Sequence, residues 1–249
     1  MNKYMTPCKL MLLTILTHLS LTALADDQSN PPIHQTWKSK PTTVSLIELY
    51  TSEGCHSCPP AERWVNTLTN HPALFKDFIP VVFHVDYWDY LGWKDRFAND
   101  EHSRRQRTLK REGIFSGVYT PGVAVGSQEW HGWRRQRVIP MSDQKAGVLT
   151  AEIRPNNLTV SFERKANYTL NIAYLGMGLS TEVTAGENNR KTLQHEFVVL
   201  KHWQKLGVGK WDVSLPPVPD KQQARNVLAI WITENGSERV VQAVGGYLR

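Results

Sequence analysis

Two cysteines separated by two residues, Cys55 and Cys58, carry the most reactive chemistry that this sequence offers. They stand in the segment GCHSCPP at residues 54–60, directly after the apolar run VSLIELY at residues 44–50. If that run is a strand and the prolines open a helix, the first thiol lies at the helix N-terminus, where unpaired N–H groups and the helix dipole stabilise a thiolate. A thiolate attacks disulfides, and a thiol one turn further on resolves the mixed disulfide. The spacing therefore predicts thiol–disulfide exchange, with Cys55 as nucleophile and Cys58 as resolving thiol.

Four further residues are candidates to support these thiols. His56 lies between them, and in its protonated form it would stabilise the Cys55 thiolate; the alternative is that it only points to solvent. Glu48 lies on the strand that leads in, where a buried carboxylate can accept a proton from the resolving thiol, and otherwise it is a surface charge. Thr120 and Pro121 precede a short apolar run, and a cis bond between them would bring a backbone edge beside the thiols for a substrate chain to pair with.

An aromatic tract, HVDYWDYLGWKD at residues 84–95, follows the second apolar run. Its residues Trp88 and Trp93 are candidates for a substrate-binding wall near the thiols. On a strand His84 and Asp86 would face the same side and could form a hydrogen-bonded pair. The alternative is a packed aromatic loop with a satisfied histidine.

Two other uses of the cysteines remain open. Zinc or copper could be held by both thiols together with His56, His84 or His131. Structural zinc sites usually take four ligands, often from two paired motifs, and no second C-x-x-C or H-x₃-H occurs, whereas copper(I) favours sulfur ligands. A purely structural disulfide is the other alternative, although closing so short a loop removes little entropy from the unfolded chain. No cofactor and no separate metal site is expected.

The elements that must position the thiols follow one another as strand, helix, strand, helix and strand, which implies a mainly parallel α/β sheet. From about residue 147 the sequence changes to short stretches in which apolar and polar residues alternate, separated by turns that contain Pro, Gly and Asn. This pattern favours an antiparallel β-sandwich. We therefore predict one domain at residues 42–146 and a second at 147–249. The runs behind the first set of elements are 44–50, 61–68, 79–87, 99–112 and 123–125.

The N-terminus has the pattern of an export signal. Lys3 and Lys9 precede the apolar run at residues 10–16, and an A-x-A sequence ends at residue 25. This predicts a secretory signal peptide at residues 1–25, with an uncleaved anchor helix as the alternative, followed by a polar leader at residues 26–41. Cleavage would leave two of the three cysteines, which can pair in an oxidising compartment. We expect a periplasmic or secreted protein that is not membrane-embedded after cleavage.

The charge of the chain bears on its partners. The formal net charge of the 249 residues is +6, and removal of the signal peptide lowers it to +4. A basic cluster at residues 104–111 is diluted by neighbouring acids and has no nucleic-acid motif beside it, so it indicates a solvated helix face. The expected partner is a protein or a small thiol, and no nucleic acid.

Several motifs together resemble one known family. GCHSCPP, FHVDYWDYLGWKDRFA, the pair Arg105-Gln106 and YTP at residues 119–121 are similar to motifs of the DUF1223 family, which comprises exported, mainly bacterial proteins of uncharacterised function. The segment at residues 185–199 resembles the C-terminal portion of that family. The resemblance implies a thioredoxin-like fold, whose working site combines C-x-x-C thiols with a cis-proline; Cys55, Cys58 and Pro121 match those positions. The expected architecture is an α/β thioredoxin-like domain followed by a mainly antiparallel β-sandwich domain.

Overall fold

The computed structural model describes, besides Met1, residues 34–135 and 137–249. Apart from Met1, the signal peptide expected at residues 1–25 lies outside the described residues, and so does the first half of the expected leader, residues 26–33. The described part is mainly β, with two α-helices, α1 (Pro59–Thr67) and α2 (Asp100–Arg111). None of the described helices combines the length and the apolar character needed to cross a membrane. Three short 3₁₀ turns are η1 (Leu68–Asn70), η2 (Asp89–Leu91) and η3 (Gly132–Arg135).

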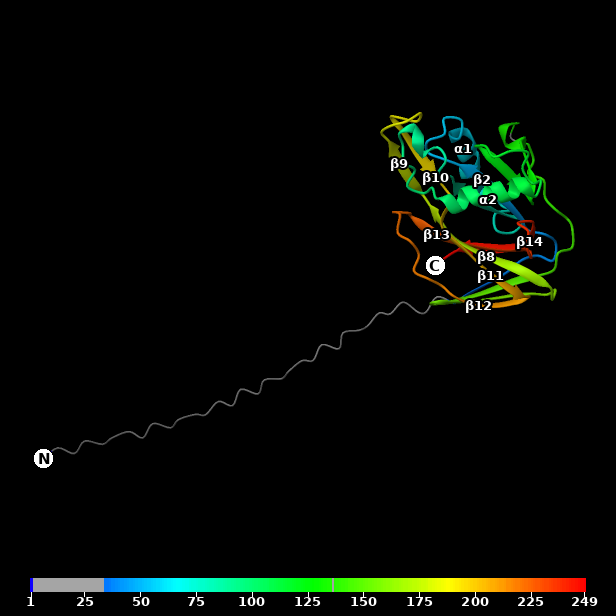
Figure 1. The fold of residues 1–249 in the computed structure, drawn as a ribbon. Helices are drawn as coiled ribbons and strands as arrows, with labels where there is room; N and C mark the ends of the chain where they lie inside the picture. The colour runs from blue at the N-terminus through cyan, green and yellow to red at the C-terminus, as the bar shows by residue number, and fades with distance from the viewer. Residues whose placement is uncertain (2–33, 136) are drawn as a thin grey trace. The chain divides into compact units, whose positions relative to one another are not determined.

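Eight strands form the larger sheet (Figure 1). Strands β2 (Ser45–Thr51) and β3 (Phe78–His84) pair in parallel along their whole length. Strand β4 (Gly122–Val125) runs antiparallel to β2, and β5 (Gln128–Glu129) runs antiparallel to β4. The mainly parallel sheet expected for the first half is therefore limited to the β2–β3 pair, because the chain reverses its direction between α2 and β4. In spatial order the strands are β14 (Val240–Tyr247), β13 (Arg225–Glu234), β8 (Asn167–Met177), β11 (Val198–Val208), β3 (Phe78–His84), β2 (Ser45–Thr51), β4 (Gly122–Val125) and β5 (Gln128–Glu129).

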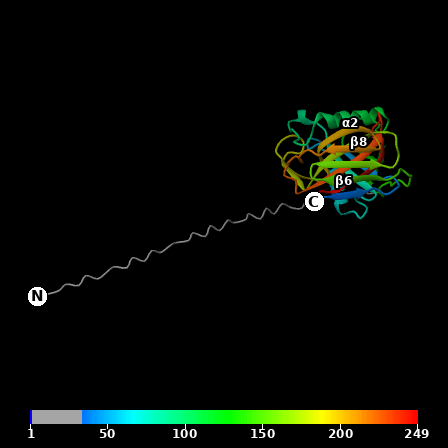
Figure 2. The same ribbon diagram turned by 90° about the horizontal axis from the view of Figure 1, so that it is seen from below.

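A smaller antiparallel sheet covers one face of β8, β13 and β14. On β13, Ile230 and Ile232 pack with the apolar side chains of this smaller sheet, while Trp231 between them faces the other core. Because successive side chains of a strand point to opposite faces, β13 contributes to two cores at once. Figure 2 shows α2, β8 and β6 as successive layers. The smaller sheet has the order β1 (Gln35–Lys38), β6 (Leu149–Arg154), β7 (Asn157–Phe162) and β12 (Lys210–Ser214).

Strand β1 lies in the segment expected to be a polar leader. It pairs antiparallel with β6, and the Trp37 ring packs close against the backbone at Gly246. A four-residue strand with a single aromatic side chain shows no period-2 pattern of its own, and it acquires its structure from β6. The leader expected up to residue 41 is therefore wrong for residues 35–38.

The boundary predicted between residues 146 and 147 stays a prediction about domains, but strands from both sides of it join one sheet. The link is the pairing of β11 with β3, which is parallel and aligns Val198 with Val82. The described residues from 34 onward also belong to one compact unit. The periodicity of single strands carries no information about such a long-range pairing.

The two helices lie on opposite faces of β2. Thr51 donates its hydroxyl to Glu62 of α1, and Glu48 accepts from Arg105 of α2. Three positions separate Thr51 from Glu48, so their side chains leave the strand on opposite sides. The hairpin of β9 (Leu179–Val183) and β10 (Lys191–His195) lies beside α1 (Figure 1), where the Asn66 side chain donates to the carbonyl of Gln194 at 2.8 Å.

Candidate functional site

Cys55 and Cys58 form a disulfide between the end of β2 and the start of α1. The S–S distance is 2.11 Å and the Cα atoms are 5.4 Å apart. Cys58 is the N-cap of α1, and its carbonyl accepts hydrogen bonds from the N–H groups of Ala61 and Glu62 at 2.9 and 3.2 Å. Pro59 and Pro60 open the helix, where no intrahelical donor is lost. The expected order of strand, C-x-x-C motif and helix is therefore present, but Cys58 and not Cys55 is the N-cap of the helix.

The disulfide is buried, although the two residues inside the motif are exposed. Cys55 and Cys58 have 1% and 0% of their surface accessible. The loop between β9 and β10 covers part of the disulfide. In that loop Asn188 is itself buried, and Glu187 accepts a hydrogen bond from the backbone N–H of His56 at 3.1 Å. His56 is exposed and contacts this loop through its backbone N–H, and stabilisation of the Cys55 thiolate by its side chain stays a prediction. Sequence reasoning gave no role to Glu187 or Asn188.

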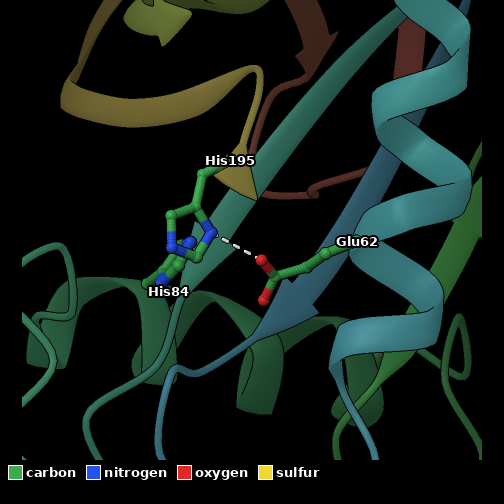
Figure 3. A group of neighbouring side chains, drawn as sticks. All are labelled: Glu62, His84 and His195. Carbon is green, nitrogen blue, oxygen red and sulfur yellow. Dashed lines mark hydrogen bonds and ion pairs between the residues drawn. The ribbon is translucent and has the colours of Figure 1, made fainter. Parts of the chain in front are cut away.

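Behind the motif lies a buried cluster of ionisable side chains. His195 contacts two carboxylates: its Nδ1 is 2.5 Å from Glu62, and its Nε2 is 3.2 Å from Glu53. His84 contacts a third, because its Nδ1 is 2.7 Å from an oxygen of Asp95. Figure 3 shows Glu62 reaching from α1 toward the two imidazoles. All five residues are buried.

Because the acids and the imidazoles lie close together, the pKa values of the two histidines are raised and those of Glu62 and Asp95 are lowered. Burial alone would lower the pKa of His195, but Glu62 and Glu53 outweigh it and raise this pKa to about 10. Burial would raise the pKa of Glu62, and His195 lowers it. His84 and Asp95 behave in the same way, with the pKa of the histidine raised and that of the aspartate lowered. Such buried and shifted groups beside a reactive motif mark a candidate functional site.

Glu48 does not take the position expected for it. Its Oε2 accepts hydrogen bonds from Arg105 at 3.0 and 3.1 Å and from the hydroxyl of Tyr50 at 2.9 Å. Arg105 also pairs with Glu238. Because Glu48 leaves β2 on the face toward α2, it is the partner of a buried arginine and not a carboxylate beneath the thiols. Glu62, on the helix that Cys58 caps, lies on the side of β2 that faces α1.

The residues expected to bind substrate form a set of internal contacts. Trp88 donates its indole N–H to the Thr120 hydroxyl at 2.7 Å, and its Cβ would be 3.3 Å from a side chain at Gly54. Trp93 donates its indole N–H to Glu53 at 2.8 Å. The bond between Thr120 and Pro121 is cis. The structure thus brings Trp88 and Thr120 together beside the residue that precedes Cys55, and both indole N–H groups are already bonded within the chain.

A groove of about 810 Å³ runs along the outer side of α1. It begins at Pro60, in the first turn after the disulfide, and extends to the segment that follows η3. Its lining combines aromatic and cationic side chains, among them Trp64, Trp133, Arg63, Arg134 and Arg137.

The family model described as "Protein of unknown function (DUF1223)" matches residues 46–233. The chain belongs to the DUF1223 family. This confirms the family resemblance drawn from the C-x-x-C motif and the aromatic tract. No curated protein matches the sequence of this family member.

Two solved structures resemble this DUF1223 chain. The crystal structure of protein AGR_C_4864 from Agrobacterium tumefaciens is 21% identical, with a TM-score of 0.61, and the match covers 83% of this chain and 95% of that one. HBP35 of Porphyromonas gingivalis is 11% identical, with a TM-score of 0.52 and coverage of 84% and 76%. At these identities the similarity concerns the fold alone.

Sequence reasoning missed most of the buried cluster. It named His84 as half of a pair, but with Asp86, whereas the partner is Asp95, and Asp86 instead accepts from Ser103. A spacing signal did exist for Glu62, which lies four residues after Cys58 and so one helical turn beyond it. No local signal could have joined His195, which lies 133 residues after Glu62.

Proposed function

We propose that this protein is an exported thiol–disulfide oxidoreductase that uses Cys55 and Cys58 on protein or small-thiol substrates. The observation that carries the proposal is the disulfide at the N-terminus of α1, where the helix dipole favours a thiolate. In one direction the Cys55 thiolate attacks a substrate disulfide and releases one substrate thiolate. Cys58, after losing its proton, then attacks Cys55 of the mixed disulfide and releases the second. The products are the Cys55–Cys58 disulfide and a reduced substrate; the reverse sequence oxidises a dithiol.

A thioredoxin-like arrangement around the cysteines is part of the proposal. Strand β2 leads into the C-x-x-C motif, and its neighbour β4 follows directly after Pro121. Pairing of β2 with β4 therefore supports a shared site for the thiols and the proline, as the family resemblance implied. The contact of Trp88 with Thr120 supports the same site from the side of the aromatic tract.

A protein partner is favoured by the surroundings of the motif. The groove along α1 starts one turn from the disulfide and offers aromatic and cationic side chains to a polypeptide. Because the disulfide itself is buried, exchange with any partner requires the β9–β10 loop to move away from Cys55. We therefore propose that access to the disulfide is controlled by this loop.

The test of the proposed activity is the reduction potential of the cysteine pair. Protein lacking residues 1–25 is equilibrated with glutathione buffers, and free thiols are trapped and counted. We expect a potential between about −120 and −270 mV, with exchange within seconds to minutes, as in working oxidoreductases. A potential well below about −300 mV would show that the disulfide is structural. An absence of exchange with an excess of dithiol under native conditions would show the same. The Cys58→Ser variant is the matched control, since it should trap a mixed disulfide on Cys55.

The proposed export has a separate test. The full-length chain is produced in a bacterium, and the mature N-terminus is determined by mass spectrometry after fractionation. Cleavage after residue 25 and recovery outside the cytoplasm are expected. An intact N-terminus in the cytoplasmic fraction would contradict the export of the protein without affecting the thiol chemistry.

A further inference from the structure

We propose that Glu62, His84 and His195 form a binding site for a divalent transition-metal ion, separate from the two cysteines. One possible ligand atom from each of the three lies within 4.8 Å of the other two. The three residues come from α1, β3 and β10, so three elements of regular structure hold the ligands (Figure 3). This site goes beyond the proposed thiol chemistry and does not depend on it.

The first argument is an unpartnered nitrogen on His84. Its Nδ1 is bound to Asp95 at 2.7 Å, and its Nε2 has no hydrogen-bond partner among the described residues, although the side chain is fully buried. A buried polar atom without a partner costs about 1–3 kcal/mol, so such atoms are uncommon unless a ligand satisfies them. Because Nδ1 is occupied, Nε2 is the atom left to bind a metal.

The second argument is the support behind both imidazoles. Histidines that bind metals usually bind a carboxylate through their other nitrogen, which fixes the ring and raises its basicity. Asp95 does this for His84. Glu53 lies at an ion-pair distance of 3.2 Å from Nε2 of His195 without completing a hydrogen bond, and Nδ1 of His195 faces Glu62.

The supporting carboxylates are held in turn. Asp95 accepts the backbone N–H groups of Glu53 and Phe97 at 2.8 and 2.9 Å, and Glu53 accepts the indole N–H of Trp93 at 2.8 Å. Two ordered pairs of carboxylate and histidine therefore point at one carboxylate, Glu62.

The third argument is the kind of ligand. Two imidazole nitrogens and one carboxylate oxygen are the donor set of many zinc sites that keep a fourth position open, and they also suit other divalent first-row metals. A metal ion that binds the two imidazoles displaces their protons, and its own two positive charges then offset most of the negative charge of the three buried carboxylates. The direct contact between His195 and Glu62, 2.5 Å long, would be replaced by two metal–ligand bonds of about 2.0–2.2 Å, with the two atoms moving apart.

The experiment uses protein that lacks residues 1–25, and with them Cys8, and whose Cys55–Cys58 disulfide is intact, so that no thiolate is available to bind metal. Chelator-treated protein is titrated with ZnCl₂ by calorimetry, and separately with Co²⁺ by absorption spectroscopy. We expect one Zn²⁺ per chain, and visible Co²⁺ bands without the near-ultraviolet charge-transfer band of a thiolate ligand. The variant Cys55→Ser/Cys58→Ser should bind Zn²⁺ as well as the wild type.

Variants identify the ligands. His84→Gln and His195→Gln should weaken Zn²⁺ binding by at least about 100-fold, and Asp95→Asn, which removes only the support, by about 10–100-fold. The matched control is His131→Gln, because His131 is an exposed histidine outside the cluster and should leave the affinity unchanged. If a buried variant fails to fold, histidine-ring NMR on the wild type decides, since Zn²⁺ should shift the signals of His84 and His195 but not of His131. Absence of binding to the oxidised wild type, unchanged affinity of a folded His84→Gln, or loss of binding in the double cysteine variant would each overturn the proposal.

Discussion

The side-chain amide of Asn188 donates a hydrogen bond to the main-chain carbonyl of Cys55 at 3.0 Å, although 133 residues separate them along the chain. The same amide nitrogen donates to the carbonyl of Glu53 at 2.8 Å, and Lys191 binds the amide oxygen at 2.8 Å. Asn188 therefore fixes the β9–β10 loop to the segment that carries the disulfide. Since both cysteines are buried, this attachment governs how often a reductant can reach them.

Replacing Asn188 by alanine is expected to make the disulfide more accessible. The change removes two hydrogen bonds between the loop and the motif, each worth about 0.5–1.5 kcal/mol. If reduction follows opening of the loop, its rate with dithiothreitol should rise by about 5- to 100-fold. The measurement is the rate of thiol release in excess reductant under native conditions. The neighbouring exposed residue Asn189, changed to alanine, is the matched control and should leave the rate unchanged. Equal rates for wild type and Asn188→Ala would mean that the loop is not what protects the disulfide.

The pair formed by Arg105 and Glu48 leads to a prediction about stability. Arg105→Met would leave the carboxylate of Glu48 buried without its cation, and the expected loss is about 3–5 kcal/mol of the free energy of unfolding. The adjacent Arg104 is exposed, so Arg104→Met should change the free energy by less than about 1 kcal/mol. Both are measured by urea denaturation at pH 7.

A substitution at Glu48 tests whether this residue has a structural or a catalytic role. Because it faces α2 and is bound to Arg105, we expect Glu48→Gln to lower the stability but to leave the reduction potential of Cys55 and Cys58 unchanged. A shift of the potential by more than about 30 mV, which corresponds to about 1.4 kcal/mol for this two-electron couple, would restore the role first expected for Glu48 as a proton acceptor.

Local sequence patterns were sufficient to predict individual helices and strands and the position of the C-x-x-C motif relative to them. The apolar run at residues 44–50 corresponds to β2, and the charged segment at residues 99–112 to α2, because alternation, capping and side-chain polarity act over a few residues. The C-x-x-C motif likewise lies where Pro59 and Pro60 begin a helix.

Contacts between distant segments could not be predicted in this way. His195 reaches Glu62, and Asn188 reaches Cys55, across more than 130 residues, and neither contact leaves a periodic signal in the sequence. The parallel pairing of β11 with β3 is of the same kind, and for that reason the sequence suggested two separate sheets where strands from both halves share one. Glu48 was misjudged because its partner Arg105 was interpreted as part of a solvated helix face.

The close approach of β14 to β13 yields a further stability prediction. A Cβ at Gly245 would lie 2.7 Å from the carbonyl oxygen of Leu228 and 3.3 Å from the Cα of Ala229, and neither backbone atom can move freely. Gly245→Ala should therefore destabilise the fold by about 1–3 kcal/mol. Gly117 meets only a tyrosine ring carbon at 3.5 Å, so Gly117→Ala is the control and should be close to neutral. Thermal unfolding of the two variants measures the difference, and equal melting temperatures would mean that β14 can shift without cost.

His102 gives the fold a dependence on pH that can be separated from the metal site. Its Nδ1 lies 2.8 Å from the carbonyl of His84 and its Nε2 3.1 Å from the side-chain nitrogen of Asn99. A neutral ring satisfies both, with Nδ1–H donating and Nε2 accepting, whereas a protonated ring has no acceptor for Asn99. Burial lowers the pKa of His102 to about 4, and the positive charges of His84 and Arg105 act in the same direction.

Because this pKa is lower in the folded state than in the unfolded chain, the unfolded chain alone gains a proton as the pH falls from about 6.5 to about 4. The stability from neutral His102 is complete above pH ~6.5 and is lost in this window, by about 1 kcal/mol between pH 7 and pH 5.5. Urea denaturation in the presence of a chelator should therefore show a smaller loss over this interval for His102→Gln than for the wild type. The exposed His131, changed to glutamine, should keep the wild-type slope. If His102→Gln and the wild type lose stability in parallel between pH 7 and 5.5, His102 is able to take up a proton inside the fold, and its hydrogen bond with Asn99 is not what keeps the ring neutral.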